Sequence, residues 1–314
     1  MPDRRSARPS RLLSLLPLPP LTNLSPPPDK LGTLQAACTF VIWGLFPLYF
    51  ALLATVPPLE VVLHRAVWSL ATLVVVLTVL RRWAWLAPLL RQPRQIAVYA
   101  TSAALIAVNW LVYIYAVQSG QVLQSSLGYF INPLVNVSLG VLVLHERLSR
   151  AQWLAVALAA CGVSWLTWTA GGLPWIALTL AVAFGVYGLV RKTAALGALE
   201  GLTAETLLLM PLALPCLIWL SSTHSVTAPV YDGTVLTLLL LSGPLTALPL
   251  WLFASAARRL PLASMGLMQY ISPTLQFGLG VWVFHEPFDT ARLLGFVFIW
   301  AGLVVFSWDA LRRR

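Results

Sequence analysis

Ten apolar runs, each about the length of a membrane-spanning helix, dominate the sequence. A helix that crosses about 30 Å of hydrocarbon needs roughly 20 apolar residues. The runs cover 32–54, 61–80, 96–118, 122–144, 151–169, 173–191, 202–220, 234–257, 262–284 and 290–308. Only 10% of the residues are charged, whereas a water-soluble domain carries about 25%. The sequence therefore predicts an all-α membrane protein with ten transmembrane helices.

Basic residues lie in alternate connections of this predicted bundle, and therefore on one side of it. Of the 20 Lys and Arg residues, all but Arg65 and Arg292 lie near the chain ends or in every second connection. Cytoplasmic connections of membrane proteins are rich in Lys and Arg, so both termini are predicted to be cytoplasmic. The net charge of +10 could also indicate nucleic-acid binding, which needs basic residues clustered on one solvated face. Here they form short runs between apolar blocks, so the expected surroundings are a lipid bilayer and no nucleic acid.

Residues 1–30 differ from the rest of the chain. They contain four arginines and several prolines, which interrupt the apolar stretch that follows the arginines. A signal peptide would have an unbroken apolar core and then a small-residue cleavage site. We therefore expect a disordered, basic, proline-rich tail, and a mis-assigned start codon is the alternative.

The sequence contains an internal repeat with an offset of 140 residues. Ile131-x-Pro133 recurs as Ile271-x-Pro273, and His145-Glu146 recurs as His285-Glu286. Each copy contains five apolar runs. Because five is odd, the second copy must enter the membrane from the opposite face. The sequence therefore predicts two inverted five-helix repeats, 31–169 and 170–314, an architecture of secondary transporters whose binding site lies near the membrane centre between the halves.

Several motifs are similar to those of a known transporter family. They are Leu59-Glu60-x3-His64-Arg65, Asn109-Trp110-x2-Tyr113, Gly128-Tyr129-Phe130-Ile131-Asn132-Pro133 and Gln269-Tyr270-Ile271-x-Pro273. Over residues 31–309 the chain resembles the RarD subgroup of the EamA-type transporters, in the drug/metabolite transporter superfamily. The resemblance implies ten helices in the inner (plasma) membrane, export of a small organic metabolite or drug, and chloramphenicol-type resistance.

Polar side chains near the centres of several runs form the candidate substrate site. Pro133 and Pro273 lie mid-run, where each removes a backbone hydrogen bond, so we expect helix breaks there; simple packing kinks are the alternative. The amides and hydroxyl beside them, and the aromatic residues at similar depth, are expected to line a cavity. These residues are Asn109, Asn132, Asn136, Ser272 and Gln276, with Trp110, Tyr113, Tyr129 and Tyr270 as aromatic walls. Helix–helix hydrogen bonding and core packing remain the alternatives.

Charged residues near the run ends are the candidate gates. Glu60 and His64 share one helix face, and Arg65 lies deeper, where a charge is costly and usually paired. We expect an outer pair of Arg65 with Glu286. The 140-residue offset then gives an inner pair of Glu205 with Arg147, beside Glu146. An arginine that reaches the outer headgroups is the alternative.

The sequence lacks recognisable enzyme signatures. It contains no His-Glu-x-x-His run and no Gly-rich phosphate loop, so we expect a transporter without cofactor or metal. Cys38, Cys161 and Cys216 have no metal-ligand spacing. Small residues, among them Gly162 and Gly302, indicate close helix packing and leave a homodimer open. The rival hypothesis is a membrane-embedded enzyme or accessory protein that acts on lipid-linked substrates.

Overall fold

The computed structural model describes residues 30–144, 149–169, 171–224, 232–257, 259–260 and 268–312. Nearly all of the predicted tail, including its four arginines, lies outside this part, as do Glu146 and Arg147. The described residues form helices and connections without a strand. The main helices are α1 Lys30–Ala51, α2 Pro58–Val79, α3 Leu86–Leu90, α4 Pro93–Gln118, α5 Val122–Leu144, α6 Arg150–Thr169, α7 Trp175–Thr193, α8 Ala198–His224, α9 Gly233–Ala257, α11 Ile271–Gly278, the π-helix η1 Leu279–Val283, and α12 Thr290–Arg312.

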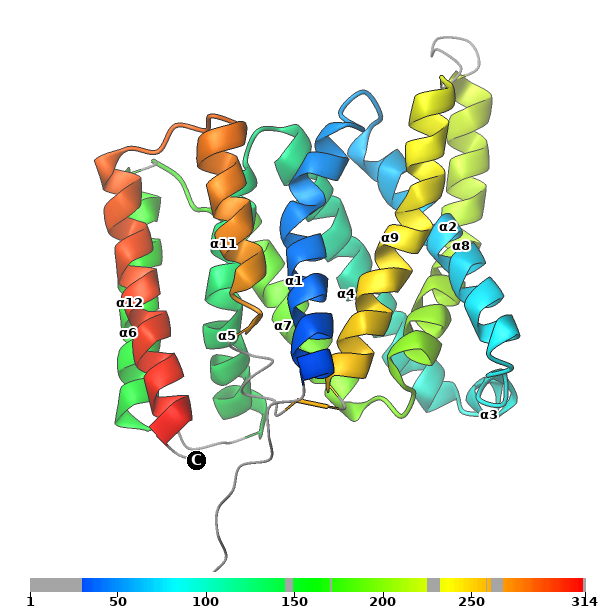
Figure 1. The fold of residues 1–314 in the computed structure, drawn as a ribbon, viewed down its shortest axis with the longest axis horizontal. Helices are drawn as coiled ribbons and strands as arrows, with labels where there is room; N and C mark the ends of the chain where they lie inside the picture. Colours follow the sequence, from blue (N-terminus) through cyan, green and yellow to red (C-terminus); the bar gives the residue numbers. More distant parts are fainter. Residues whose placement is uncertain are drawn as a thin grey trace, which may run out of the picture.

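The long helices run side by side from one end of a bundle to the other (Figure 1). Seven of them are long and apolar enough to cross a membrane, namely α1, α2, α4, α6, α8, α9 and α12. Helix α7 contributes a shorter apolar stretch, Trp175–Arg191. Many large apolar side chains face outward, such as Trp168 at 76% exposure and Leu212 at 75%, as expected for surfaces covered by lipid. The all-α, multi-pass membrane fold is confirmed, whereas ten crossings and the orientation of the termini stay predictions.

Connections with many basic residues lie at one end of the bundle. The start of α1, the end of α12 and the short helix α3 are found together at this end (Figure 1). The α1–α2 connection and the start of α12 lie at the opposite end, which we call the arginine-poor end. Helix α3 was not predicted, because its five residues, LAPLL, are too few for a recognisable period.

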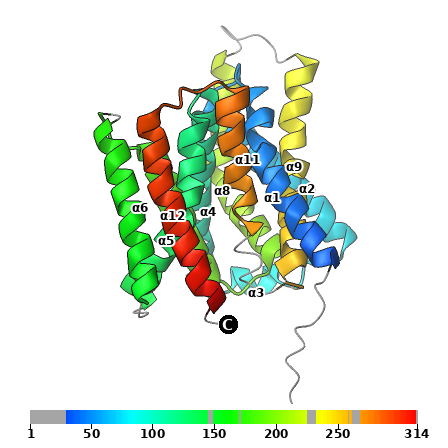
Figure 2. The same cartoon turned by 60° about the vertical axis from the view of Figure 1, so that its left-hand side comes forward.

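The most extensive packing joins helices that are distant in the sequence. Helix α6 packs against α12, α5 against α7, and α2 against both α8 and α9, while α1 contacts α9 and α11. Figure 2 shows α6 and α12 adjacent at one edge of the bundle. Each of these contacts joins one predicted repeat to the other, so the two halves are interleaved along the bundle.

Small residues allow the closest of these approaches. A Cβ atom added at Gly162 would lie 2.7 Å from the carbonyl oxygen of Gly295, and one at Gly302 would lie 2.8 Å from that of Ala155. The predicted close packing is therefore confirmed, and it joins α6 to α12 within one chain. These residues are not available as a dimer face, so the homodimer stays a prediction that needs another surface.

Candidate substrate site

Arg65 lies inside the bundle, seven residues after the start of α2. Its side chain is only 5% exposed, and its Nε donates a hydrogen bond to Thr246 Oγ1 of α9 over 3.0 Å. At about 1.5 Å per residue, Arg65 lies roughly 10 Å along α2 from the arginine-poor end. A buried position this far from the helix end does not fit an arginine that reaches the headgroups.

Aromatic rings surround the Arg65 guanidinium. Its Cζ lies 4.2 Å from the ring centroid of Trp110 on α4, and 5.4 and 5.6 Å from those of Phe50 and Phe46 on α1. A guanidinium within about 6 Å of a ring centroid is attracted to the negative ring face. The three rings therefore stabilise the cation without neutralising it.

Asn109, Tyr113 and Tyr129, three of the predicted substrate residues, cluster beside the rings that face Arg65, since the Tyr113 ring lies 6.0 Å from that of Phe50. The Tyr129 hydroxyl of α5 donates to Asn109 Oδ1 over 3.4 Å, and Asn109 Nδ2 donates to the Leu180 carbonyl of α7 over 3.3 Å. The rings of Tyr113 and Tyr129 are 5.8 Å apart, and the buried Tyr113 hydroxyl has no hydrogen-bond partner among the described residues. We call the whole cluster the central site, and it consists of Arg65 with Thr246, Phe46, Phe50 and Trp110 around it, together with Asn109, Tyr113 and Tyr129.

Other predicted substrate residues connect helices instead. Ser272 Oγ of α11 donates to the Phe40 carbonyl over 2.6 Å, and Gln276 Nε2 donates to the Trp43 carbonyl over 3.2 Å. Both acceptors belong to α1, so these two side chains hold α11 against α1. Tyr270, at the start of α11, packs on an apolar cluster that contains residues of α5, α6 and α12. The sequence placed these residues at a similar depth but could not show which helix each one faces.

The remaining predicted residues of the candidate site are two amides and a proline in α5 and a proline in α11. Asn132 is fully buried, and its amide has no partner within the described part of the chain. The side chain of Asn136 lies outside the described residues. Helix α5 continues without interruption through Pro133, so the predicted break there is not seen. Pro273 lies in the first turn of α11, where proline is tolerated because that turn has no backbone partner for its nitrogen.

Glu205 is the buried charge near the opposite end of the bundle. It lies seven residues into α8 and is fully buried. Ser102 of α4 donates to its Oε1, Tyr187 of α7 donates to its Oε2 over 3.3 Å, and Arg191 Nε of α7 lies 3.5 Å from Oε1. The Glu205 network thus connects α4, α7 and α8.

Of the two predicted gate pairs, the outer pair of Arg65 with Glu286 is not formed in this structure. Glu205 contacts Arg191, and its predicted partner Arg147 lies outside the described residues with Glu146. Glu286 does not bind Arg65, because its carboxylate accepts hydrogen bonds from the backbone amides of Val122 and Leu123. Glu60 is buried in the first turn of α2 and lies near His64. His64 Nδ1 accepts a 3.3 Å hydrogen bond from Trp68 Nε1.

Glu286 caps the N-terminus of α5. The first amides of a helix have no partner within it and carry partial positive charge, so a carboxylate at this place is stabilising. The π-helix η1 positions Glu286, whose own amide donates to the Gly280 carbonyl over 2.9 Å. Burial raises the pKa of Glu286 above its usual value, although the amides of Leu123 and Val122 and nearby Arg292 act in the opposite direction. Sequence analysis missed this role because the cap joins residues more than 160 positions apart.

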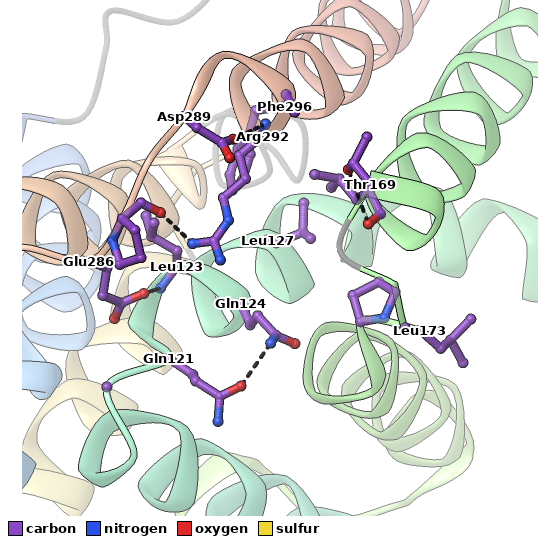
Figure 3. Close-up of a pocket in the computed structure, with 16 residues that line it drawn as sticks. Gln121, Leu123, Gln124, Leu127, Thr169, Leu173, Glu286, Asp289, Arg292 and Phe296 are labelled. Carbon is purple, nitrogen blue, oxygen red and sulfur yellow. Dashed lines mark hydrogen bonds between the residues drawn. The ribbon is translucent and has the colours of Figure 1, made fainter.

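A cavity of about 410 Å³ opens beside this cap, away from the central site. It lies between α5, the end of α6 and the start of α12 at the arginine-poor end (Figure 3). The side chains of Gln121, Gln124 and Arg292 contribute polar groups to it, and the Arg292 guanidinium donates to the Pro287 carbonyl. The predicted central cavity is therefore not the one found here. Within the described residues, no group of three or more His, Cys, Asp or Glu could hold a metal ion.

Replacing Glu286 with alanine should destabilise the protein. The two amides of α5 would lose a charged acceptor, a loss worth about 1.5–3 kcal/mol, which lowers Tm by roughly 5 °C for a chain of this size. Glu200→Ala is the control, because Glu200 forms only a partly exposed ion pair with Arg82 at 3.5 Å, worth about 0–1 kcal/mol. Thermal unfolding of the purified protein in detergent measures both, and equal Tm values for the two variants would contradict the cap.

Comparisons with known proteins agree with this architecture. Residues 30–168 match the model of the EamA-like transporter family. The chain is 45% identical over 281 residues to the uncharacterized transporter PA0485 of Pseudomonas aeruginosa, covering 90% of this chain and 94% of that one. It is 46% identical over 284 residues to protein RarD of Streptomyces exfoliatus, covering 90% of each. A solved crystal structure with 21% identity covers 90% of this chain and 98% of its own, with a TM-score of 0.56. The chain therefore belongs to the RarD group of the EamA-like transporter family, within the drug/metabolite transporter superfamily.

Proposed function

We propose that this multi-pass membrane transporter exports a small organic solute across the bacterial inner membrane. The observation that carries the proposal is the central site, where a buried cation, aromatic rings and an amide from α1, α2, α4, α5 and α9 meet inside the bundle. Charged side chains within a membrane protein mark solute pathways by default. Metabolites and drugs are the proposed solute classes, and chloramphenicol-type resistance follows only from the family resemblance.

Alternating access between two inverted repeats, 31–169 and 170–314, is the proposed mechanism. It is supported by the interleaved packing of α6 with α12, α5 with α7 and α1 with α11, which provides interfaces along which one half can move relative to the other. Ten crossings, with the split helix of α11 and η1 as the ninth, are part of this proposal. The Glu205 network lies at the end with many basic residues, where it would serve as the inner gate. The residues around Glu60, His64 and Arg65 would serve as the outer gate.

Reconstitution into proteoliposomes tests transport directly. Solutes from a bacterial extract that leave or enter vesicles chemically unchanged, and only when the protein is present, would support a transporter. The rival hypothesis, an enzyme or accessory protein for lipid-linked substrates, predicts a covalently altered product instead. The names of the relatives as transporters favour the first outcome.

A cysteine-labelling experiment tests the orientation. The three native cysteines, two of which are exposed, are replaced first. A cysteine at exposed Ser222, near the end of α8, should react with an impermeant thiol reagent from outside the cell. A cysteine at Leu90, which is 64% exposed on α3, should react only after the membrane is opened. The reverse pattern would overturn the cytoplasmic placement of the termini.

A further inference from the structure

We propose that the transported solute carries a carboxylate, or another planar oxyanion, which binds the two terminal nitrogens of Arg65. The inference rests on the proposed function and adds the chemical class of the solute. It does not follow from the family resemblance, because chloramphenicol itself carries no carboxylate.

The charge balance at Arg65 points to an anionic solute. Within the described residues, no carboxylate lies within 4.0 Å of its guanidinium. A guanidinium has five N–H groups, and here only Nε–H donates, to Thr246. The four N–H groups on the terminal nitrogens are thus available in the planar fork that binds a carboxylate through two parallel hydrogen bonds.

Arg191, whose side chain is 17% exposed, shows the contrast. Arg191 lies near Glu205 with a nitrogen–oxygen distance of 3.5 Å, and its guanidinium also packs on Gly201, where a Cβ atom would lie 2.0 Å from Nη1. The fold therefore supplies a protein carboxylate to partly exposed Arg191, whereas among the described residues buried Arg65 has only rings and a hydroxyl. A buried charge without a counter-charge is costly, and a solute carboxylate would supply the missing one.

The side chains around Arg65 point to a solute with an apolar body. Trp110, Phe50 and Phe46 offer ring faces within 5.6 Å of the guanidinium centre. Ser69 lies one helical turn after Arg65 on the same face of α2, and its buried hydroxyl has no partner among the described residues, like that of Tyr113. Rings for an apolar body, and free hydroxyls beside a cation, suit an amphiphilic organic acid better than an inorganic anion.

Ligand-dependent thermal stability of the purified full-length protein tests the proposal. The probes are benzoate, phenylacetate and hexanoate, each compared with its neutral amide. A ligand that binds only the folded state raises Tm, and we expect at least one carboxylate to do so by about 2–4 °C at a concentration near ten times its Kd. The matching amide should give no shift. If no carboxylate exceeds its amide, the proposal is wrong.

Variants assign the shift to Arg65. The shift should vanish in Arg65→Gln and decrease in Arg65→Lys, which keeps the charge but loses the planar fork. Arg91→Gln is the matched control, because it removes the same charge from an exposed position at the end of α3, and it should keep the full shift. A shift that persists in Arg65→Gln would show that the anion binds elsewhere and would overturn the proposal.

Proteoliposome transport separates this proposal from the proposed function. If the protein moves chloramphenicol or another neutral solute, and no probe carboxylate inhibits that movement, the proposed transport function is supported. The proposal that the solute carries a carboxylate is then wrong. The opposite result is a protein that moves no solute but whose Tm a carboxylate raises in an Arg65-dependent way. That result would support the carboxylate site and contradict the proposed transport function.

Discussion

Replacing Arg65 with glutamine is expected to abolish solute transport while the protein stays folded. Removing one partner of a buried, hydrogen-bonded charge pair costs about 2–5 kcal/mol of binding, which corresponds to a roughly 30-fold to several-thousand-fold loss. The partner here would be the solute, so the loss should appear in the transport rate at limiting solute. Efflux from proteoliposomes measures it.

Stability distinguishes this functional role from a structural one. A buried charge without a carboxylate partner destabilises its own fold, and glutamine has no charge, so the Tm of Arg65→Gln should equal or exceed that of the parent protein. The cation–π contacts with Trp110, Phe50 and Phe46 limit this gain, since each is worth roughly 0.5–2 kcal/mol. Arg91→Gln should transport at the parent rate. A lowered Tm in Arg65→Gln, with transport per folded molecule unchanged, would make Arg65 a structural residue.

The substitution with the largest expected effect on stability is Gly243→Ala, at the contact between α9 and α2. An added Cβ atom would lie 2.2 Å from the carbonyl oxygen of Trp68 and 2.6 Å from Thr72 Oγ1. A backbone oxygen cannot turn aside as a side chain can, so the two helices must separate. Overpacking of this kind costs about 1–3 kcal/mol and occasionally more, which lowers Tm by roughly 2–9 °C, and by more where the cost exceeds that range.

The same substitution should also disturb the central site. Thr246 lies three residues after Gly243, and it accepts the Arg65 Nε hydrogen bond. Separation of α9 from α2 would therefore lengthen that bond and misplace the guanidinium. Gly188→Ala in α7 is the control, because nothing lies within 4 Å of its added Cβ atom and alanine favours a helix by about 1 kcal/mol. Tm values that change equally in both variants would refute the close α2–α9 contact.

Most of the secondary structure was predictable from the sequence. Within lipid every backbone polar group must be satisfied inside the chain, so each long apolar run has to be a helix, and α4, α5 and α6 begin and end within about three residues of the predicted limits. The ninth run differs, because the structure divides its described part into a turn, α11 and the π-helix η1. A π-helix adds one residue to a turn, and the hydrophobic pattern carries no signal for it.

The central site was predictable only in part. Asn109, Trp110 and Tyr113 share α4, and Tyr129 joins them from α5, as their common depth suggested. Ser272 and Gln276 are at a similar depth but bind the backbone of α1. Depth follows from position along a helix, whereas the direction of a side chain depends on which helix lies beside it.

The partners of the charged residues were decided by the tertiary structure alone. The sequence by itself determined that the chain is a bundle of apolar helices with basic residues in every second connection, because hydrophobicity and the charge of short connections act locally along the chain. It also identified Arg65 as a costly buried charge. Whether that charge meets Glu286 or the ring of Trp110 depends on contacts between residues far apart in sequence, such as Arg65 with Thr246, 181 positions away. Such contacts exist only after the helices have packed, so no local pattern predicts them.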